Sequence, residues 1–392
     1  MAARRKYDIV IFGATGFTGG LTAEYLASHA GETLRWALAG RNEDKLKSVR
    51  EQLARLDPEC AELPLLIADT GDAESMRALA ASTKVVITTV GPYIHYGEPL
   101  VAACAAAGTD YVDLTGEPEF VDQMWLRYHE QARESGARIV HCCGFDSIPH
   151  DLGAYFTVLQ LPEDVPLKVE GFVRAGGTFS GGTLHSAITA FSRMREYAKV
   201  SRERRQRDAW PLDRKIGSTK ASIHRVAEFG AWAVPMPTID PQIVRRSAAA
   251  LDRYGPNFRY GHYVLVKQLV KVGLLLGGVA GMFAGAQLKL TRERLLKLRD
   301  PGQGPSDEQR RKGWFRVRFI GEGGGRRVIT EVSGGDPGYG ETSKMLAESA
   351  LCLAQDRLPR KGGVLTTAQA MGDALMRRLI AAGIQFKVLE ST

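Results

Sequence analysis

Short runs of apolar, β-branched and aromatic residues alternate with amphipathic stretches over roughly the first 145 residues of the chain. The apolar runs are 7–12, 34–40, 63–69, 84–91, 110–116 and 137–144. Runs of this length are typical of strands that are buried on both faces, and the stretches between them have helical periodicity. Regular alternation of strands and helices predicts a Rossmann-like α/β fold with a doubly wound parallel sheet.

Three glycines follow the first apolar run and precede a helical pattern, which begins the alternation with a strand, a turn and a helix. In a dinucleotide site the first glycine permits the tight turn, the second admits the pyrophosphate, and the third lets helix and strand pack closely. The N–H groups at the start of the helix then face the phosphates. The loop residues predicted to bind the cofactor are Gly13, Ala14, Thr15, Gly16, Phe17 and Thr18.

The end of the second run indicates which nucleotide is bound. Enzymes that select NAD usually place a carboxylate there for the ribose hydroxyls, whereas this chain has Arg41 followed by Asn42. A planar guanidinium suits a 2′-phosphate, and Lys45 lies one helical turn further on, so the sequence predicts NADP. Four more residues predicted to line the cofactor follow the third and fourth runs: Asp69, Thr89, Gly91 and Pro92.

The remaining chain has a different organisation. We predict an NADP-binding Rossmann domain over residues 1–148, an α+β substrate or dimerisation domain over 149–341, and a C-terminal helical segment over 342–392. Apolar residues alternate with polar ones on both sides of a GEGGG turn, which predicts a β-hairpin over 314–334. Ser180 or Thr183 is expected to cap a helix that follows a glycine-rich turn.

An apolar helix is expected near residues 264–290, where no charged residue occurs between Lys271 and Gln287. The uncharged run is shorter than the ~20 residues that span a bilayer. Its glycines recur every four residues and so fall on one helix stripe, which suits close packing. Three interpretations stay open: a homodimer seam, a helix in a membrane interface, and the lining of an acyl-chain tunnel. Contact with membrane or lipid is favoured.

Composition narrows the class of protein. The five cysteines form no C-x-x-C pair and no His/Cys cluster with zinc-ligand spacing, so we expect reduced, buried thiols and no metal. The N-terminus has no apolar signal segment, which predicts a cytoplasmic protein. A net charge of +8 suits an anionic membrane or an acidic protein, but no nucleic-acid-binding signature accompanies it.

Several longer motifs resemble one family of enzymes. They are GATGFTGG, AGRN, VGPYIHYGEPLVAACAAAGTDYVDLTGE, CGFDSIPHDLG, GGTFSGGTLHS and GGDPGYGETSKMLAESALCLA. Over nearly its whole length the chain resembles the saccharopine-dehydrogenase-like oxidoreductases, in the branch that contains the mycobacterial trans-acting enoyl reductases. The resemblance implies a Rossmann domain, a second α+β domain, C-terminal helices that pack back on the first, and NADP chemistry on a hydrophobic, lipid-like substrate.

The expected activity is NADPH-dependent reduction of an unsaturated acyl or polyketide-lipid intermediate. Donors should gather at the strand ends, and the catalytic candidates there are Tyr93, Tyr96, Glu117 and His150. One alternative is a saccharopine-type dehydrogenase that acts on an amino-acid adduct, and another is a non-catalytic NADP-sensing or lipid-associated binding protein. The basic run 199–208 is a candidate docking site for an acyl-carrier domain, and a peripheral position on the inner face of the plasma membrane is expected.

Overall fold

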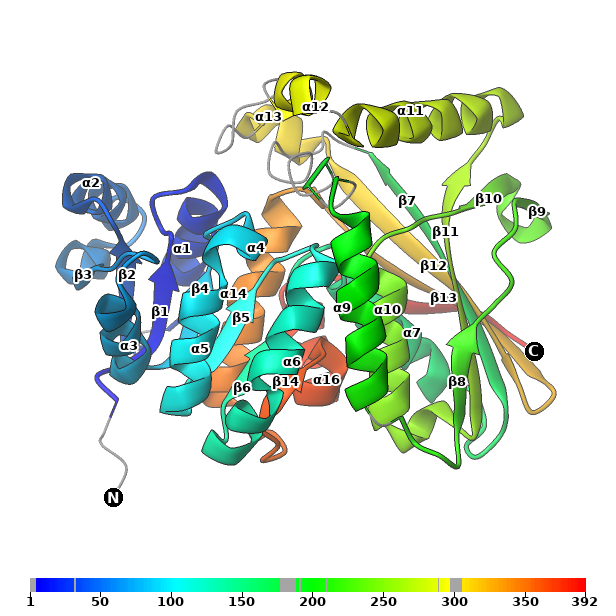
Figure 1. The fold of residues 1–392 in the computed structure, drawn as a ribbon, viewed down its shortest axis with the longest axis horizontal. Helices are drawn as coiled ribbons and strands as arrows, with labels where there is room; N and C mark the ends of the chain where they lie inside the picture. The colour runs from blue at the N-terminus through cyan, green and yellow to red at the C-terminus, as the bar shows by residue number, and fades with distance from the viewer. Residues whose placement is uncertain are drawn as a thin grey trace. The chain divides into compact units, whose positions relative to one another are not determined.

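The chain forms two compact units, which are drawn in Figure 1 from a computed structural model. The structure describes residues 5–31, 33–176, 188–189, 192–208, 210–287, 289–296 and 305–392. The first unit comprises mainly Met1–Phe145 and Gly338–Ala382, and the second mainly Asp146–Pro301, Pro305–Pro337 and Gly383–Thr392. The helix cap expected at Ser180 or Thr183 lies outside the described residues.

The first unit contains a seven-stranded parallel sheet with the strand order β14-β6-β5-β4-β1-β2-β3. Its strands are β1 (Tyr7–Phe12), β2 (Trp36–Gly40), β3 (Leu65–Ile67), β4 (Thr83–Thr88), β5 (Asp110–Asp113), β6 (Arg138–Val140) and β14 (Gly363–Leu365). Every residue of β1 and β2 is buried, as expected for strands that helices cover on both faces. The predicted Rossmann-like sheet is therefore confirmed, and β14 is an additional strand beside β6.

Helices follow the strands of this sheet in the expected alternation. They are α1 (Phe17–His29), α2 (Glu43–Ala54), α3 (Ala73–Ser82), α4 (Tyr93–Tyr96), α5 (Glu98–Ala107) and α6 (Pro118–Ser135), with a short 3-10 helix at Pro58–Glu62. Met76, Leu100 and Met124 of α3, α5 and α6 share one buried cluster with Val10 and Val86 of the sheet. Helix α14 (Gly340–Gln355) packs against α1, β4 and β5, which confirms that a C-terminal helix returns to the first domain.

The C-terminal segment differs from the expectation that residues 342–392 are helical. Helices α14, α15 (Thr367–Ala370) and α16 (Gly372–Ala381) are present, but β14 joins the first sheet and β15 (Gln385–Ser391) joins the second. Strand β15 pairs with β13 in register Val332 to Phe386, and its Phe386 and Val388 alternate with polar residues. This period-2 pattern is typical of an edge strand and was available in the sequence.

The second unit contains an eight-stranded mixed sheet with the order β15-β13-β12-β7-β11-β10-β9, and β8 pairs with β11. Its other strands are β7 (Leu167–Gly176), β8 (Lys215–Ser218), β9 (His224–Val226), β10 (Ala231–Pro235), β11 (Asn257–Val266), β12 (Trp314–Gly323) and β13 (Arg326–Gly334). The β12–β13 hairpin confirms the prediction, with Phe315, Val317 and Phe319 buried in alternation.

The helices of the second unit are α7 (Ile148–Leu159), α9 (Met194–Arg207), α10 (Asp240–Ala250), α11 (Leu269–Gln287), α12 (Lys289–Leu296) and α13 (Asp307–Arg311), with 3-10 turns at Ala227–Phe229 and Asp252–Tyr254. Helix α7 packs on β7, β12 and β13, and α10 packs on α7 and β11. These two helices and β11 bring three chemically important side chains together, as described below.

Helix α11 begins later than the expected position near 264 because residues up to Val266 belong to β11. Only 12% of the most apolar 18-residue stretch of this helix is buried. Among the described residues, α11 is the one helix that is long and apolar enough to cross a membrane. Its exposed large side chains are Leu269, Val270, Leu274, Leu276, Val279 and Phe283. A soluble protein rarely exposes so continuous an apolar surface without a partner.

Candidate active site

The glycine loop that joins β1 to α1 has the geometry that its sequence requires. Gly13 has a φ of +91°, and a Cβ there would lie 2.8 Å from Thr89 Oγ1 and 2.8 Å from Val90 Cγ2. A Cβ on Gly19 would lie 2.1 Å from the carbonyl oxygen of Gly13. Gly16 is exposed, and a Cβ on it would approach only that same carbonyl, at 3.3 Å. The first and third glycines therefore shape the turn, and the second leaves room for a ligand.

The start of α1 is suited to an anion. Its N-cap is Gly16, which has no side chain to satisfy the first N–H groups, and the first turn contains no acidic residue. The N–H groups of a first helical turn have no partner within the helix and carry the positive end of the helix dipole. Ala14, Thr15, Phe17 and Thr18 complete the loop and the first turn, so the predicted cofactor-binding residues are contiguous at this site.

Arg41 directly follows β2, where a NAD-selecting carboxylate would stand. Its side chain is 76% exposed, and its Nε lies 4.0 Å from Oδ2 of Asp69, a weak and well solvated ion pair. Asn42 caps α2 by accepting a hydrogen bond from the backbone N–H of Lys45, so Lys45 lies in the first turn and is exposed. A flexible guanidinium with no strong partner can reach a 2′-phosphate at little cost.

The carboxyl ends of β1 and β4 are neighbours at the centre of the sheet, where the strand order reverses. Ligands of doubly wound sheets bind at this point. Thr89 Oγ1 donates a hydrogen bond of 3.1 Å to the Gly13 carbonyl, which ties the loop after β4 to the glycine loop. Gly91 and Pro92 follow and lead into α4.

Two of the four catalytic candidates have structural partners inside the first unit. Tyr93 is buried in the core, where its hydroxyl donates to the Thr88 carbonyl at 3.1 Å, and burial raises its pKa well above the usual value. The buried carboxylate of Glu117 accepts hydrogen bonds from the N–H groups of Tyr93 at 3.1 Å and Ile94 at 2.8 Å. Glu117 therefore caps the short helix α4, and a catalytic role for either residue stays a prediction.

The other two candidates occupy different surroundings. Tyr96 ends α4 and is 48% exposed, so its hydroxyl is accessible in the first unit. His150 lies in the first turn of α7 in the second unit, where it is buried with Asp240 and His262. Within the first unit the structure thus brings Tyr93, Tyr96 and Glu117 together around α4, while His150 belongs to another cluster.

A carboxylate network lies at the ends of β5 and β6, around a residue that is not one of the four catalytic candidates. Asp113, fully buried, accepts hydrogen bonds from Tyr111 Oη at 2.9 Å, His141 Nδ1 at 2.6 Å, and the backbone N–H groups of Thr115 and Cys142 at 3.1 and 3.0 Å. Such a network fixes both loops at the same edge of the sheet as the glycine loop. Its sequence signal was an aspartate, Asp113, at the end of a buried strand.

The second unit contains a buried cluster of two imidazoles and a carboxylate. His150 Nε2 lies 3.8 Å from Asp240 Oδ1, and His262 Nε2 lies 3.5 Å from Asp240 Oδ2. Burial, reinforced by the neighbouring His262, lowers the pKa of His150 well below its usual value, and burial lowers the pKa of His262 to about 4. Burial raises the pKa of Asp240 well above its usual value despite a hydrogen bond from Thr238. These shifts disfavour the charged form of each of the three side chains.

Comparison with known proteins agrees with this geometry. The model of the saccharopine dehydrogenase NADP binding domain matches residues 9–140, which contain the glycine loop and Arg41. A Mycobacterium tuberculosis protein named as a trans-acting enoyl reductase is 42% identical, with 98% of each chain covered. The chain belongs to the saccharopine-dehydrogenase-like family, in the branch of the trans-acting enoyl reductases. It is an NADP-dependent oxidoreductase.

Other members of this branch match over similar lengths. Trans-acting enoyl reductases of Mycobacterium bovis and Mycobacterium ulcerans are 37% and 35% identical, and the alignments cover 97% and 98% of each chain. The saccharopine dehydrogenase (L-Glu forming) of Saccharomyces cerevisiae is similar in structure, with a TM-score of 0.57 over 98% of this chain and 100% of that one. Its sequence identity is 12%, so this likeness concerns the fold alone.

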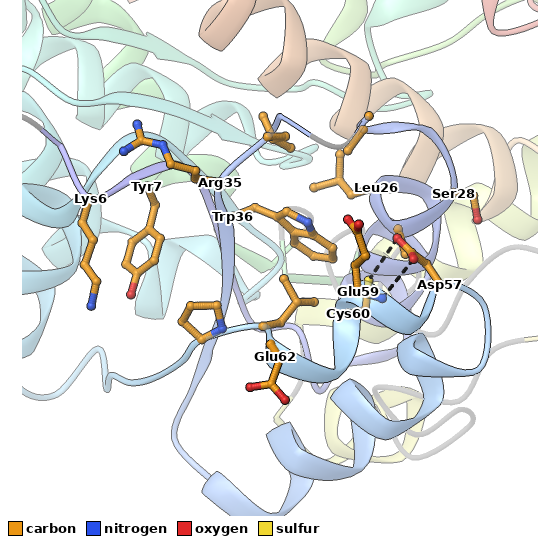
Figure 2. A pocket seen from close by; sticks show the side chains of 16 residues that line it. Lys6, Tyr7, Leu26, Ser28, Arg35, Trp36, Asp57, Glu59, Cys60 and Glu62 are labelled. Atoms are coloured by element: carbon orange, nitrogen blue, oxygen red, sulfur yellow. Dashed lines mark hydrogen bonds between the residues drawn. The ribbon is translucent and has the colours of Figure 1, made fainter.

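A separate cavity of about 620 Å³ opens at the amino ends of β1 and β2, as Figure 2 shows. Tyr7, Trp36 and Cys60 are among its lining residues, and burial raises the pKa of the Cys60 thiol to about 11. The glycine loop leaves β1 at its carboxyl end, so this cavity lies at the opposite edge of the sheet from the nucleotide site. The oxidoreductase chemistry of the family is therefore assigned to the carboxyl edge.

Proposed function

We propose that the protein is an enoyl reductase that acts in trans on an unsaturated acyl or polyketide-lipid intermediate. NADPH held by the glycine loop and Arg41 would supply the hydride for the β-carbon of the enoyl thioester, with a proton added at the α-carbon, so that the products are the saturated thioester and NADP⁺. The observation that carries this proposal is 35–42% identity, over 97–98% of the chain, to proteins named trans-acting enoyl reductase. The protein's own residues would hold the nucleotide and orient the thioester.

The charge at the carboxyl edge of the first sheet favours an acyl substrate over a saccharopine-like adduct. The loops that follow β1 to β6 are described in full and contain a single lysine or arginine, Arg41. A substrate with two or more carboxylates usually requires several converging arginines. Because Arg41 is already assigned to the 2′-phosphate, this edge offers no further cation for a diacid substrate.

Tyr96 is the candidate in the first unit that we propose to contact the substrate. It stands at the end of α4, a few residues after Gly91 and Pro92, and its side chain is exposed. A phenol in this position could donate a hydrogen bond to the thioester carbonyl as charge develops there. Tyr96→Phe should lower kcat with little change in the Kd for NADPH, whereas an equal fall for His95→Gln would contradict a specific role for the tyrosine.

One panel of substrates separates the candidate functions. Purified protein is incubated with NADPH and, in parallel, with enoyl thioesters, saccharopine and small ketones, and nicotinamide absorbance is followed. Oxidation of NADPH by enoyl thioesters alone supports the proposal. Saccharopine is itself the reduced compound, so in its reaction NADP⁺ replaces NADPH, and a rise in NADPH absorbance supports the alternative. Tight NADPH binding without oxidation by any substrate would favour a sensor over an enzyme.

We propose further that α11 rests on a lipid surface. Val270 and Leu274 are 77% and 71% exposed and lie four residues apart, so they share one helix face. Burial of one such side chain contributes about 1.5–3 kcal/mol, and the helix carries several. Lys267 and Lys271 stand near its start, where they can meet anionic headgroups. Peripheral contact of this kind suits a cytoplasmic enzyme at the inner face of the plasma membrane.

Vesicle flotation tests this contact. The full chain should float with anionic vesicles, and Val270→Glu with Leu274→Glu should abolish flotation. The matched control is Ile380→Glu with Leu389→Glu, since these exposed apolar residues lie outside α11 and should leave flotation unchanged. If the wild-type protein stays unbound but forms a homodimer that the α11 variant breaks, the helix is a subunit interface and the lipid proposal is wrong.

Not every arginine of the basic run 199–208 can contact an acyl-carrier domain. Arg204 is buried and paired with Asp208 at 3.5 Å, so it cannot meet a partner, whereas Arg202 and Arg205 of α9 are exposed. We propose that Arg202 and Arg205 attract an acidic carrier domain. Reversal of both charges should raise KM for a carrier-bound enoyl group and leave KM for the free thioester unchanged; equal effects on both substrates would end the proposal.

A further inference from the structure

Three side chains from separate elements converge in the second unit. His150 comes from the first turn of α7, Asp240 is the first residue of α10, and His262 lies within β11. All three are buried, and one ligand atom from each lies within 4.8 Å of the other two. This set contains two imidazole nitrogens and one carboxylate oxygen, a donor combination found in zinc sites.

The distances within the cluster are too long for hydrogen bonds between its members. The nitrogen-to-oxygen separations of 3.8 Å for His150 and 3.5 Å for His262 exceed the ~3.2 Å limit of a good N–H···O bond. Tetrahedral zinc with ligands at about 2.0–2.2 Å places its ligand atoms roughly 3.3–3.6 Å apart. The two nitrogen-to-oxygen separations, which run to different oxygens of Asp240, are near this range, and the three ligand atoms all lie within 4.8 Å of one another.

Neighbouring groups orient the ligands as the second shell of a metal site does. Tyr260 Oη lies 3.4 Å from His262 Nδ1, which leaves Nε2 as the nitrogen that faces Asp240. Thr238 Oγ1 donates a hydrogen bond of 2.5 Å to Asp240 Oδ2, while the buried Oδ1 has no hydrogen-bond partner among the described residues. A carboxylate that is held by a hydrogen bond is a typical outer-shell feature of a metal site.

We propose that His150, Asp240 and His262 bind a divalent transition-metal ion, for which Zn²⁺ is the probe. Imidazole nitrogens and a carboxylate oxygen are ligand types that such an ion accepts, and the ion would supply the positive charge that a buried Asp240 carboxylate requires. Because the ligands are buried, the ion stabilises the packing of α7, α10 and β11, and this role does not depend on the proposed reaction.

Metal content and thermal melting test the site on the full chain. Protein purified from zinc-supplemented cells should contain about one zinc ion per chain, as measured by elemental mass spectrometry. Removal by a strong chelator should lower Tm, and added Zn²⁺ should restore it. Asp240→Asn and His262→Gln should each lose the zinc, whereas His224→Gln, a histidine of β9 outside the cluster, should retain it.

Co²⁺ provides a readout that does not depend on the stability of a variant. Wild-type protein loaded with Co²⁺ should show the intense visible absorption of a four-coordinate site with nitrogen and oxygen ligands, and the His224→Gln protein should show the same spectrum. The proposal is overturned if the wild-type protein carries no zinc and its Tm does not respond to Zn²⁺. It is also overturned if Asp240→Asn and His262→Gln retain as much metal as the wild type.

Discussion

Removal of the Arg41 guanidinium should change which nicotinamide nucleotide the protein prefers. Arg41 is 76% exposed, and in the described part of the chain its one ion pair is with Asp69, at 4.0 Å, so its main contribution should be to a bound 2′-phosphate. A hydrogen bond to a charged group contributes about 1.5–3 kcal/mol, and solvent exposure favours the lower half of that range. Since each ~1.4 kcal/mol is a factor of ten, Arg41→Ala should weaken NADPH binding by about 10–30-fold.

Calorimetric titration of both nucleotides provides the assay. NADH lacks the 2′-phosphate, so its Kd should be the same for Arg41→Ala and the wild type. Lys47→Ala is the control that removes the same charge nearby. Lys47 lies on α2, shortly after Arg41, but its ammonium pairs with Glu43 at 2.9 Å and should not contact the nucleotide. Higher salt should shrink the wild-type preference for NADPH. An unchanged ratio of the two Kd values in Arg41→Ala, or an equal change in Lys47→Ala, would refute the assignment.

Three further predictions concern the first unit. Gly19→Ala would place a Cβ 2.1 Å from a loop carbonyl oxygen and should lower the unfolding free energy by about 1–3 kcal/mol, as measured by scanning calorimetry. A Cβ on Gly20 comes no closer than 3.8 Å to its neighbours, so the control Gly20→Ala should have the Tm of the wild type. Burial alone would raise the pKa of Asp8, but hydrogen bonds led by Arg35 lower this pKa to about 2. The ionised carboxylate should therefore stabilise the fold by about 1 kcal/mol above pH 4, and this contribution should be lost between pH 4 and 2. Denaturant titrations over this pH range should show a smaller loss of stability for Asp8→Asn than for the wild type. Glu117→Gln leaves one of two backbone N–H groups without its charged acceptor and should lower the unfolding free energy by about 1–3 kcal/mol in urea titrations; full stability with lost turnover would instead favour a catalytic carboxylate.

Features set by local chain geometry could be predicted from the sequence. The glycine loop requires a positive φ at Gly13 and a close approach at Gly19, and both requirements select glycine whatever the rest of the fold does. Strand–helix alternation likewise predicted where the first six strands fall along the chain, because each strand occupies its own short apolar run. The hairpin over 314–334 depended only on its turn and on alternation.

Features that depend on distant parts of the chain could not be predicted in this way. His150 and Asp240 are separated by 90 residues and Asp240 and His262 by 22, and no spacing rule links such positions. Tyr93 lies in the motif that suggested catalysis, yet its ring fills the core, because the short helix α4 turns it inward. Whether a tyrosine of α4 is buried or exposed depends on which face of this helix packs against the core. A helix of four residues is too short for its residue pattern to determine that face.

The motif at the start of α14 has a structural role at the nucleotide site, although more than 300 residues separate the two in sequence. The Tyr339 ring packs edge-on against Phe17 with centroids 4.7 Å apart, and Ser343 Oγ donates to the Thr18 carbonyl at 3.4 Å. Thr342 Oγ1 accepts a hydrogen bond of 3.1 Å from the N–H of Phe145, which follows β6. The same helix turn thus holds the first turn of α1 and the end of the last Rossmann strand. Because the N–H groups of α1 must be fixed before phosphate arrives, the first unit is complete as a binding site only when the returning C-terminal chain is in place.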